Sequence, residues 1–280
     1  MIIVDITQVM ILSVLTDNDT RTYNEGLLRH MVLNNLRSYR TKFKNKYGEL
    51  VLAFEGKDSW RKKAFPNYKA NRAVNRASSG IDWNELYAGF NKMRDEIAEN
   101  FPYKVMQVNG CEGDDIIAVI AMNDKDNHMI ISSDKDYAQL QKYSNVHQYD
   151  PRKKLIVNCK NPEAFLREHI IRGDTSDGVP NFLSPDDGCI SAVKQKCIYK
   201  KNMSGWLDTT EDKFLSSLDE ETRQRYARNQ QLIDFSKIPE EYVDKILEMY
   251  KIPSRNSRDK ILNYFIKNKL KELMLLLHEF

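Results

Sequence analysis

Short apolar segments that run into acidic residues recur along the first half of the chain, and they constrain the fold more than any other feature. They are "IIVD" (2–5), "LVLAFEG" (50–56), "YKVMQV" (103–108) and "MIISSDKD" (129–136). Residues with helical spacing lie between them, so strands and helices alternate. The alternation predicts an α/β fold with a mostly parallel central sheet and helices on both faces. "NVHQYD" (145–150) predicts a further strand.

The strand pattern ends near residue 180, and the rest of the chain is charged and has helical periodicity. We therefore expect an α/β domain at 1–180 and a smaller helical region at 181–280. The polar, basic stretch 71–80, "NRAVNRASSG", is the segment that the sequence predicts to be mobile.

Composition excludes several classes of protein. The 280 residues carry a net charge of only +3, so the partner must be read from where charges cluster rather than from their sum. The 4 cysteines are scattered, which disfavours a zinc site and indicates free thiols in a reducing cytosol. No apolar run reaches the length of about 20 residues that spans a bilayer. The N-terminus lacks a basic region and contains Asp5, so it predicts a first core strand rather than a signal peptide.

The acidic residues at the strand ends are expected to converge. The carboxyl ends of parallel strands lie along one edge of a sheet, where ligands bind. In an extended chain Asp134 and Asp136 would point to the same side, about 6.5–7 Å apart, with Lys135 pointing away. Two further acids follow in "RGDTSDGVP". The expected cluster comprises Asp5, Glu55, Glu112, Asp114, Asp115, Asp134, Asp136, Asp174 and Asp177.

Such a cluster requires positive charge. Each pair of carboxylates in contact at about 4 Å costs on the order of 4 kcal/mol at an effective dielectric constant of about 20. Ligands that are all oxygen select Mg²⁺, Mn²⁺ or Ca²⁺ over zinc or copper. A single aspartate after a strand is more often a helix N-cap or a turn residue, and only the repetition of acids favours a metal site.

A basic segment at residues 59–81 contains no acid and interleaves cations with Trp60, Phe65 and Tyr68. Cations neutralise phosphates and aromatic faces stack on bases, so the segment is compatible with nucleic-acid binding. The alternative is a solvated basic helix whose aromatic residues pack in the core. A second basic run at 194–201, "KQKCIYKK", is positioned to hold a duplex.

The motifs together resemble the flap-endonuclease family of structure-specific 5′ nucleases, and within it the RNase H branch from T-even-like bacteriophages. They are "WRKKAFPNYKANR", "CEGDDIIAV", "IISSDKDYAQL" and "RGDTSDGVP". The resemblance implies a PIN-like fold and two Mg²⁺ ions about 3.5–4 Å apart, for which Mn²⁺ can substitute. It also implies 5′→3′ exonuclease and flap cleavage of RNA–DNA and DNA–DNA duplexes, with removal of primers from lagging-strand fragments.

The same resemblance assigns residues and partners. The nine acids above correspond to metal-binding positions, Lys69 would contact the scissile phosphate, and Arg72 lies one helical turn further on. Relatives work with a single-strand-binding protein and a sliding clamp, and we expect a monomer in the cytoplasm of the infected bacterium. Residues 181–280 would bind DNA. The expected nucleic-acid contacts are Arg61, Lys62, Lys63, Tyr68, Arg76, Lys194 and Lys196.

Two departures from the family pattern leave alternatives open. Position 55 is Glu rather than the usual Asp, and no glycine-rich helix–hairpin–helix follows "DGVP". One alternative is a Mg²⁺-dependent phosphatase with an Asp-x-Asp nucleophile, which the wide spread of acids disfavours. The other is a catalytically weakened DNA-binding relative, in which Glu55 marks decay of the site.

Overall fold

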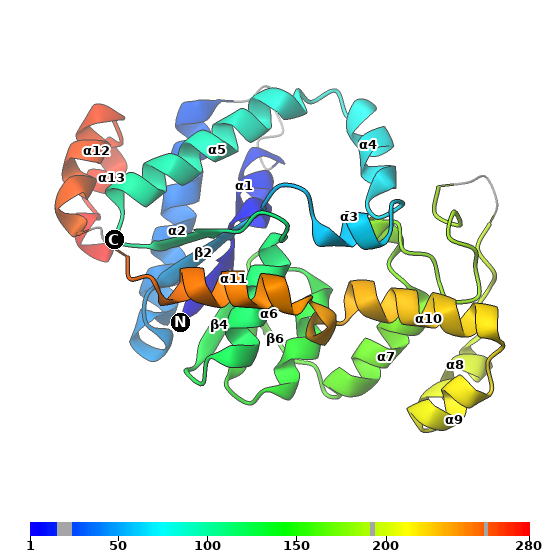
Figure 1. The fold of residues 1–280 in the computed structure, drawn as a ribbon. Coiled ribbons are helices and arrows are strands. Elements are labelled where there is room, and N and C mark those ends of the chain that lie inside the picture. The colour runs from blue at the N-terminus through cyan, green and yellow to red at the C-terminus, as the bar shows by residue number, and fades with distance from the viewer. Residues whose placement is uncertain (16–23, 191–193, 255–256) are drawn as a thin grey trace.

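The computed structural model describes residues 1–15, 24–190, 194–254 and 257–280. In this part of the chain one central sheet has the strand order β3-β2-β1-β4-β5-β6 (Figure 1). The strands are β1 (Ile2–Asp5), β2 (Leu50–Phe54), β3 (Lys104–Gln107), β4 (His128–Ile131), β5 (Val146–Asp150) and β6 (Leu155–Val157). All neighbours pair in parallel except β5 and β6. The expected α/β fold with a mostly parallel sheet is therefore confirmed. The short antiparallel edge strand β6 was not predicted.

Side chains alternate between the two faces of the sheet, and both faces are buried. Ile2 and Val4 pack in one hydrophobic cluster, while Ile3 between them packs in another. Met129 and Ile130 are divided in the same way. Burial on both faces explains why these strands appear in the sequence as continuous apolar runs.

One face of the sheet is covered by α1 (Ile6–Leu15), α2 (Glu25–Tyr47) and α5 (Trp83–Asn100). The last residues of the chain join the same cluster through α12 (Ile261–Lys267) and α13 (Lys271–Met274). Figure 1 shows these helices, in red, beside α5. The C-terminal region is helical as expected, but residues 181–280 do not form a separate packing unit, because Phe265 and Phe280 are buried among residues of α2 and α5.

The opposite face is covered by α6 (Gly113–Asn123), the 3₁₀ helix η1 (Lys135–Lys142) and α11 (Glu240–Lys251). A separate hydrophobic cluster lies beyond the sheet. The helices that pack in it are α7 (Pro162–Arg172), α8 (Lys200–Leu207), α9 (Glu211–Ser216) and α10 (Glu220–Ile233). The chain also forms the short helices α3 (Trp60–Ala64), α4 (Ala70–Ala77), η2 (Thr175–Asp177) and η3 (Phe235–Lys237). The short helices η4 (Arg258–Lys260) and η5 (Leu277–Glu279) complete the chain.

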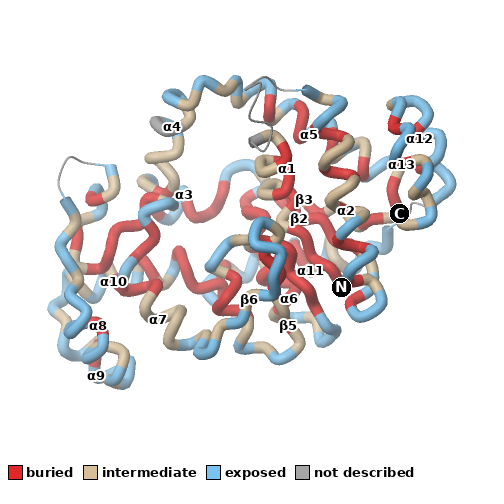
Figure 2. The backbone as a smooth tube through the Cα atoms, turned by 180° about the vertical axis from the view of Figure 1, so that it is seen from behind, coloured by how far each residue is buried: buried red, intermediate tan, exposed pale blue. Residues whose placement is uncertain are grey.

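The aromatic residues of the basic segment 59–81 pack inward. Trp60, Phe65 and Tyr68 are only 3%, 4% and 3% exposed. The first two residues of α3, Trp60 and Arg61, are buried and the rest of α3 is exposed, while Figure 2 shows α4 as half-buried and exposed. The alternative in which these aromatics belong to the core is therefore the correct one, and they do not offer faces for stacking on bases. Among the described residues, no helix combines the length and apolar character that a membrane span requires.

Candidate active site

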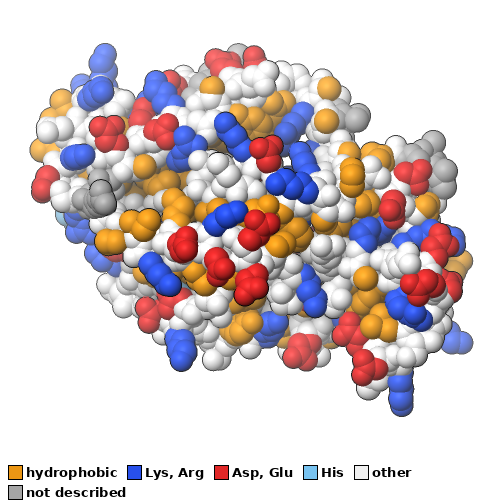
Figure 3. All heavy atoms as spheres, in the orientation of Figure 1, with side chains coloured by type: hydrophobic (Ala, Val, Ile, Leu, Met, Phe, Trp, Pro, Cys, Tyr) orange, Lys and Arg blue, Asp and Glu red, His pale blue; other side chains and the backbone are white. Residues whose placement is uncertain are grey.

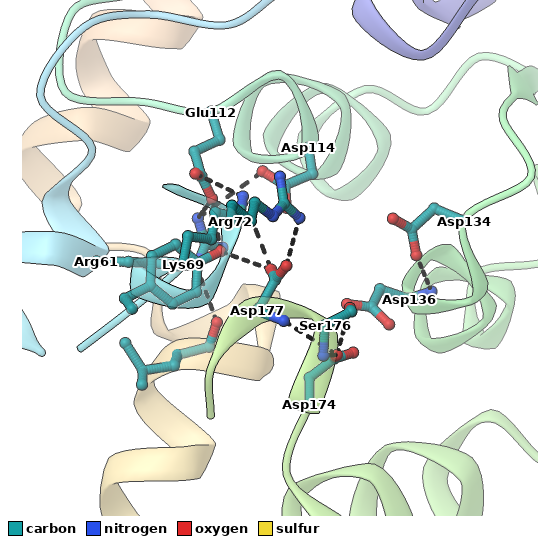
Figure 4. Close-up of polar contacts among 12 residues, drawn as sticks. Arg61, Lys69, Arg72, Glu112, Asp114, Asp134, Asp136, Asp174, Ser176 and Asp177 are labelled. Carbon is teal, nitrogen blue, oxygen red and sulfur yellow. Dashed lines mark hydrogen bonds and ion pairs between the residues drawn. The ribbon is translucent and has the colours of Figure 1, made fainter. Parts of the chain in front are cut away.

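Acidic residues from several strands meet where the strand order reverses direction. Strand β1 lies between β2 and β4, and Asp5 is its last residue. Glu55 follows β2, Asp134 follows β4, and Glu112 begins α6. This is the crevice at the carboxyl ends of the strands in which α/β proteins bind ligands. Figure 4 shows Glu112, Asp114 and Asp177 around Lys69 and Arg72, with Asp134 and Asp136 on the far side of Asp177.

The N-terminus of α6 is closed by a capping box. The backbone N–H of Glu112 donates to Asp115 Oδ2 at 2.8 Å, and Trp60 Nε1 donates to the same oxygen at 3.2 Å. Asp115 Oδ1 is paired with the Arg61 guanidinium at 2.8 Å, and the residue is fully buried. Oδ2 is therefore hydrogen-bonded and Oδ1 is ion-paired, both to protein groups. In this structure Asp115 anchors the helix that presents Glu112 and Asp114, whereas the sequence predicted that it binds a metal ion.

The Arg61 side chain is 2% exposed and lies beneath the acidic cluster. Its Nε donates to the carbonyl of Leu232 at 2.8 Å, and its NH1 lies 3.3 Å from Glu112 Oε2. Arg61 was expected to contact nucleic acid, but a buried guanidinium cannot reach a phosphate backbone. It is an internal counterion of the acids.

Lys69 and Tyr68 link the two sides of the cluster. Lys69 Nζ lies 2.6 Å from Glu112 Oε1 and 3.7 Å from Asp177 Oδ2. The Tyr68 hydroxyl is within 2.7 Å of Glu112 Oε2 and 2.9 Å of Asp177 Oδ2. Tyr68, which was also expected to contact nucleic acid, is thus buried and orients carboxylates. Arg72 pairs with Asp177 Oδ1 at 2.5 Å, and its side chain is 42% exposed.

On the sheet side, backbone amides and hydroxyls hold the acids. Asp5 accepts hydrogen bonds from the Gln8 amide at 3.2 Å and the Ser132 hydroxyl at 3.1 Å. Glu55 Oε2 accepts from the Gly113 amide at 3.3 Å. Asp134 is the N-cap of η1 and accepts from the Asp136 amide at 3.0 Å. The chain therefore turns into a helix after Asp134, so the expected extended geometry of Asp134 and Asp136 is wrong.

These acids are short of positive charge. Burial raises the pKa of Asp5, and it raises the pKa of Glu55 and of Asp134 to about 7. Burial also raises the pKa of Asp114. At Glu112 burial acts in the same direction, but Lys69 and Arg61 outweigh it and lower the pKa. Carboxylate oxygens that are gathered, buried and not neutralised by protein cations fit hard divalent ions.

The acids of η1 and η2 contact a histidine and a lysine. Asp174 Oδ1 accepts from the amide and hydroxyl of Ser176 at 2.8 and 2.5 Å. Lys135 Nζ lies 2.9 Å from Asp174 Oδ2, so the expectation that Lys135 points away from the site is wrong. His169 Nε2 lies 3.0 Å from Asp136 Oδ1 and 3.4 Å from Asp174 Oδ2. Although burial alone would lower the pKa of His169, the two carboxylates raise it to about 9.

His169 was not found from the sequence. It is one histidine within the helix "PEAFLREHIIR", and nothing in that segment distinguishes it from a core residue. Only the packing of α7 against η1 reveals its role.

The remaining basic residues lie at the surface. Lys62, Lys63, Lys194 and Lys196 are exposed, and the Arg76 guanidinium lies over the rings of Trp83 and Tyr87 at 5.3 Å from each centroid. Lysine and arginine side chains are spread over the face seen in Figure 3 with acidic side chains between them. Contact of these five residues with nucleic acid stays a prediction.

Comparison with known proteins agrees with this geometry. A model of the 5′–3′ exonuclease N-terminal resolvase-like domain matches residues 12–169, and a model of the T4 RNase H C-terminal region matches residues 161–280. Ribonuclease H of Enterobacteria phage T4 is 30% identical over 289 residues, covering 99% of this chain and 95% of that protein. The chain belongs to the 5′–3′ exonuclease family. It is a nuclease, and the resemblance stated from its motifs is confirmed.

Two further relatives of this nuclease extend the comparison. The exonuclease of Escherichia phage T7 is 32% identical over 123 residues, which is 42% of this chain and 38% of that protein. The T5 D15 protein, co-crystallised with metal ions, shares the fold with a TM-score of 0.65 and 16% identity, covering 89% of this nuclease and 99% of that chain. The PIN-like architecture is thereby established for this chain.

Proposed function

We propose that this nuclease is a divalent-metal-dependent 5′→3′ exonuclease and flap endonuclease that acts on RNA–DNA and DNA–DNA duplexes and removes RNA primers from lagging-strand fragments. The gathering of carboxylates around Lys69 at the switch point of the sheet carries the proposal. The motif order and the relatives named above support the choice of a 5′ nuclease over other phosphotransfer enzymes.

Eight acids would hold two Mg²⁺ or Mn²⁺ ions. On the side of the sheet they are Asp5, Glu55, Glu112, Asp114 and Asp134, and opposite them Asp136, Asp174 and Asp177. When bound, such ions generate hydroxide from water and stabilise the oxygen that leaves. Asp115 is left out of this set because Arg61, Trp60 and the Glu112 amide occupy its oxygens.

Lys69 supplies the cation that faces the phosphate. Its backbone is left-handed, with φ of 57°, and its N–H donates to the carbonyl of Asp177 at 2.7 Å. This position directs the ammonium toward the acids, where it would offset charge that develops on the phosphoryl oxygens. Arg72, which is held by Asp177 and is partly exposed, would contact the neighbouring phosphate.

Surface cations would hold the substrate. Lys62, Lys63 and Arg76 lie on the basic segment, and Lys194 and Lys196 lie in the C-terminal region. Each contact with a phosphate adds to the salt dependence of binding. The proposed role would bring the enzyme to DNA beside a single-strand-binding protein and a sliding clamp.

Cleavage of a 5′-labelled primer–template with and without Mg²⁺ tests the proposal. We expect Asp134→Asn to abolish cleavage while a gel shift without metal shows duplex binding close to that of the unmodified enzyme. Asp95→Asn, at a side chain that is 68% exposed, is the matched control and should cleave normally. Retained cleavage by Asp134→Asn contradicts the proposal, and release of phosphate from a small monoester without cleavage of DNA would indicate a phosphatase.

A further inference from the structure

A histidine and two aspartates converge where α7 packs against η1 and η2. One atom each from Asp136, His169 and Asp174 lies within 4.8 Å of the others. The side chains of His169 and Asp174 are 6% and 7% exposed, and that of Asp136 is 22% exposed, so the cluster is largely buried and reaches solvent at Asp136. The metal-dependent function proposed above uses the two aspartates and assigns nothing to the histidine.

Two of these atoms face each other without a hydrogen bond. His169 Nε2 and Asp136 Oδ1 are 3.0 Å apart, and both are buried. They form an ion pair, but within the described part of the chain neither has a partner in hydrogen-bond geometry. The ring nitrogen therefore points between the carboxylates of Asp136 and Asp174 rather than at one of them. Buried polar atoms nearly always have a partner, and those that lack one require an explanation such as a missing ion.

We propose that His169 is a metal ligand, and that with Asp136 and Asp174 it forms a mixed nitrogen and oxygen site that prefers Mn²⁺ over Mg²⁺. An imidazole nitrogen suits transition-metal ions, whereas Mg²⁺ prefers oxygen ligands in a near-ideal octahedron. The inference rests on the proposed function, because the two aspartates are also counted among its metal-binding acids.

The surrounding contacts keep two of the three ligands in place. The His169 ring stacks on Phe165 with centroids 5.8 Å apart, and Ser176 holds Asp174 Oδ1 through two hydrogen bonds. Lys135 shares Asp174 Oδ2 at 2.9 Å, but its side chain is 57% exposed and can move into solvent when an ion binds. A metal ion would therefore displace the mobile cation of Lys135 and the proton of His169, and it would require little rearrangement of the ligands.

Pulsed electron paramagnetic resonance of the Mn²⁺ complex tests the assignment directly, because it detects the ¹⁴N nucleus of a coordinated imidazole. The probe is Mn²⁺ alone, added to the full chain without substrate. We expect nitrogen coupling in the unmodified enzyme and its loss in His169→Gln. His278→Gln, at a side chain that is 77% exposed, is the matched control and should keep the coupling. Isothermal titration should show Mn²⁺ affinity falling at least ~10-fold in His169→Gln, with less effect on Mg²⁺.

The possible failures are distinguishable. Mn²⁺ that binds to the unmodified enzyme without nitrogen coupling overturns the imidazole ligand and leaves the carboxylate site standing. Coupling that persists in His169→Gln overturns the assignment to this residue. If no Mn²⁺ binds, both this inference and the proposed function fail. The absence of nitrogen coupling in the unmodified enzyme would overturn the inference without any variant. The inference can therefore be tested even if His169→Gln does not fold.

Discussion

Lys69 Nζ lies 2.6 Å from Glu112 Oε1, so the central cation of this nuclease is paired with one of its proposed metal ligands. The contact neutralises part of the acidic cluster and fixes the ammonium over it. The carboxylates of Asp177 and Glu112 outweigh burial and raise the pKa of Lys69, so it is protonated throughout the physiological range.

Replacing Lys69 should therefore impair chemistry more than binding. We expect Lys69→Met to lower kcat by about 10²-fold or more, as removal of a preorganised transition-state contact does elsewhere. Single-turnover cleavage of a labelled flap with Mg²⁺ measures the effect. Lys63→Met, at an exposed position of the same basic segment, should change kcat little. Equal losses of kcat in the two variants would mean that Lys69 contributes only one positive charge among others and makes no specific contact in the transition state.

The raised pKa values of Glu55 and Asp134 predict how stability depends on pH. These groups ionise in the unfolded chain near their ordinary values of 4.5 and 3.8, but only at about 7 in the folded protein. Between about pH 4 and pH 7 the folded state binds more protons, so these groups make the free energy of unfolding fall as pH rises. Without metal, the free energy of unfolding of Asp134→Asn should fall less as pH rises. At pH 8 this variant should therefore be more stable than the unmodified enzyme.

Divalent ions should reverse the effect. Because ions bind the ionised carboxylates, Mg²⁺ or Mn²⁺ should raise Tm more at pH 8 than at pH 5. Thermal unfolding at pH 5 and pH 8 measures this effect, with the divalent ion present in one sample and about 5 mM EDTA in the other. An equal shift at both pH values would show that the raised pKa values are not coupled to metal binding.

The C-terminal helices should depend on one carboxylate. Glu96 accepts hydrogen bonds from Arg29 Nε and NH2, both at 2.8 Å, and from the Tyr264 hydroxyl at 2.6 Å. It thus joins α2, α5 and α12. We expect Glu96→Gln to lower the free energy of unfolding by about 1.5–3 kcal/mol, the usual cost of hydrogen bonds to a charged group. Urea unfolding measures this, with Glu99→Gln at an exposed site as control. A loss below about 0.5 kcal/mol would contradict the role of this carboxylate.

The sequence predicted most of the strands and the edge of the sheet where acids meet, because these features depend on local patterns. Apolar runs that end in Asp5, Glu55 and Asp134 were sufficient to place β1, β2 and β4 and the edge where their acids meet. The edge strand β6 has only three residues, which are exposed or half-buried, so no pattern distinguished it.

Contacts between distant segments were not predictable. Arg61 and Lys62 are adjacent basic residues in the sequence, yet one is buried beneath the acids and the other is exposed. Which of them turns inward depends on the first turn of α3 and on the carbonyl of Leu232, more than 150 residues away. Lys135 and His169 reach the site for similar reasons, through the packing of α7 on η1.

This difference between neighbours allows a last test. Arg61→Met would leave Asp115 buried without its cation, and breaking such a buried pair costs about 3–5 kcal/mol. Lys62→Met should leave stability within about 0.5 kcal/mol. If Lys62 contacts a phosphate, its loss should also reduce the slope of log K against log[salt] by about 1. Urea unfolding and duplex binding at several salt concentrations separate the two residues. An Arg61 variant of normal stability with a reduced salt slope would restore the sequence-based view that Arg61 binds nucleic acid.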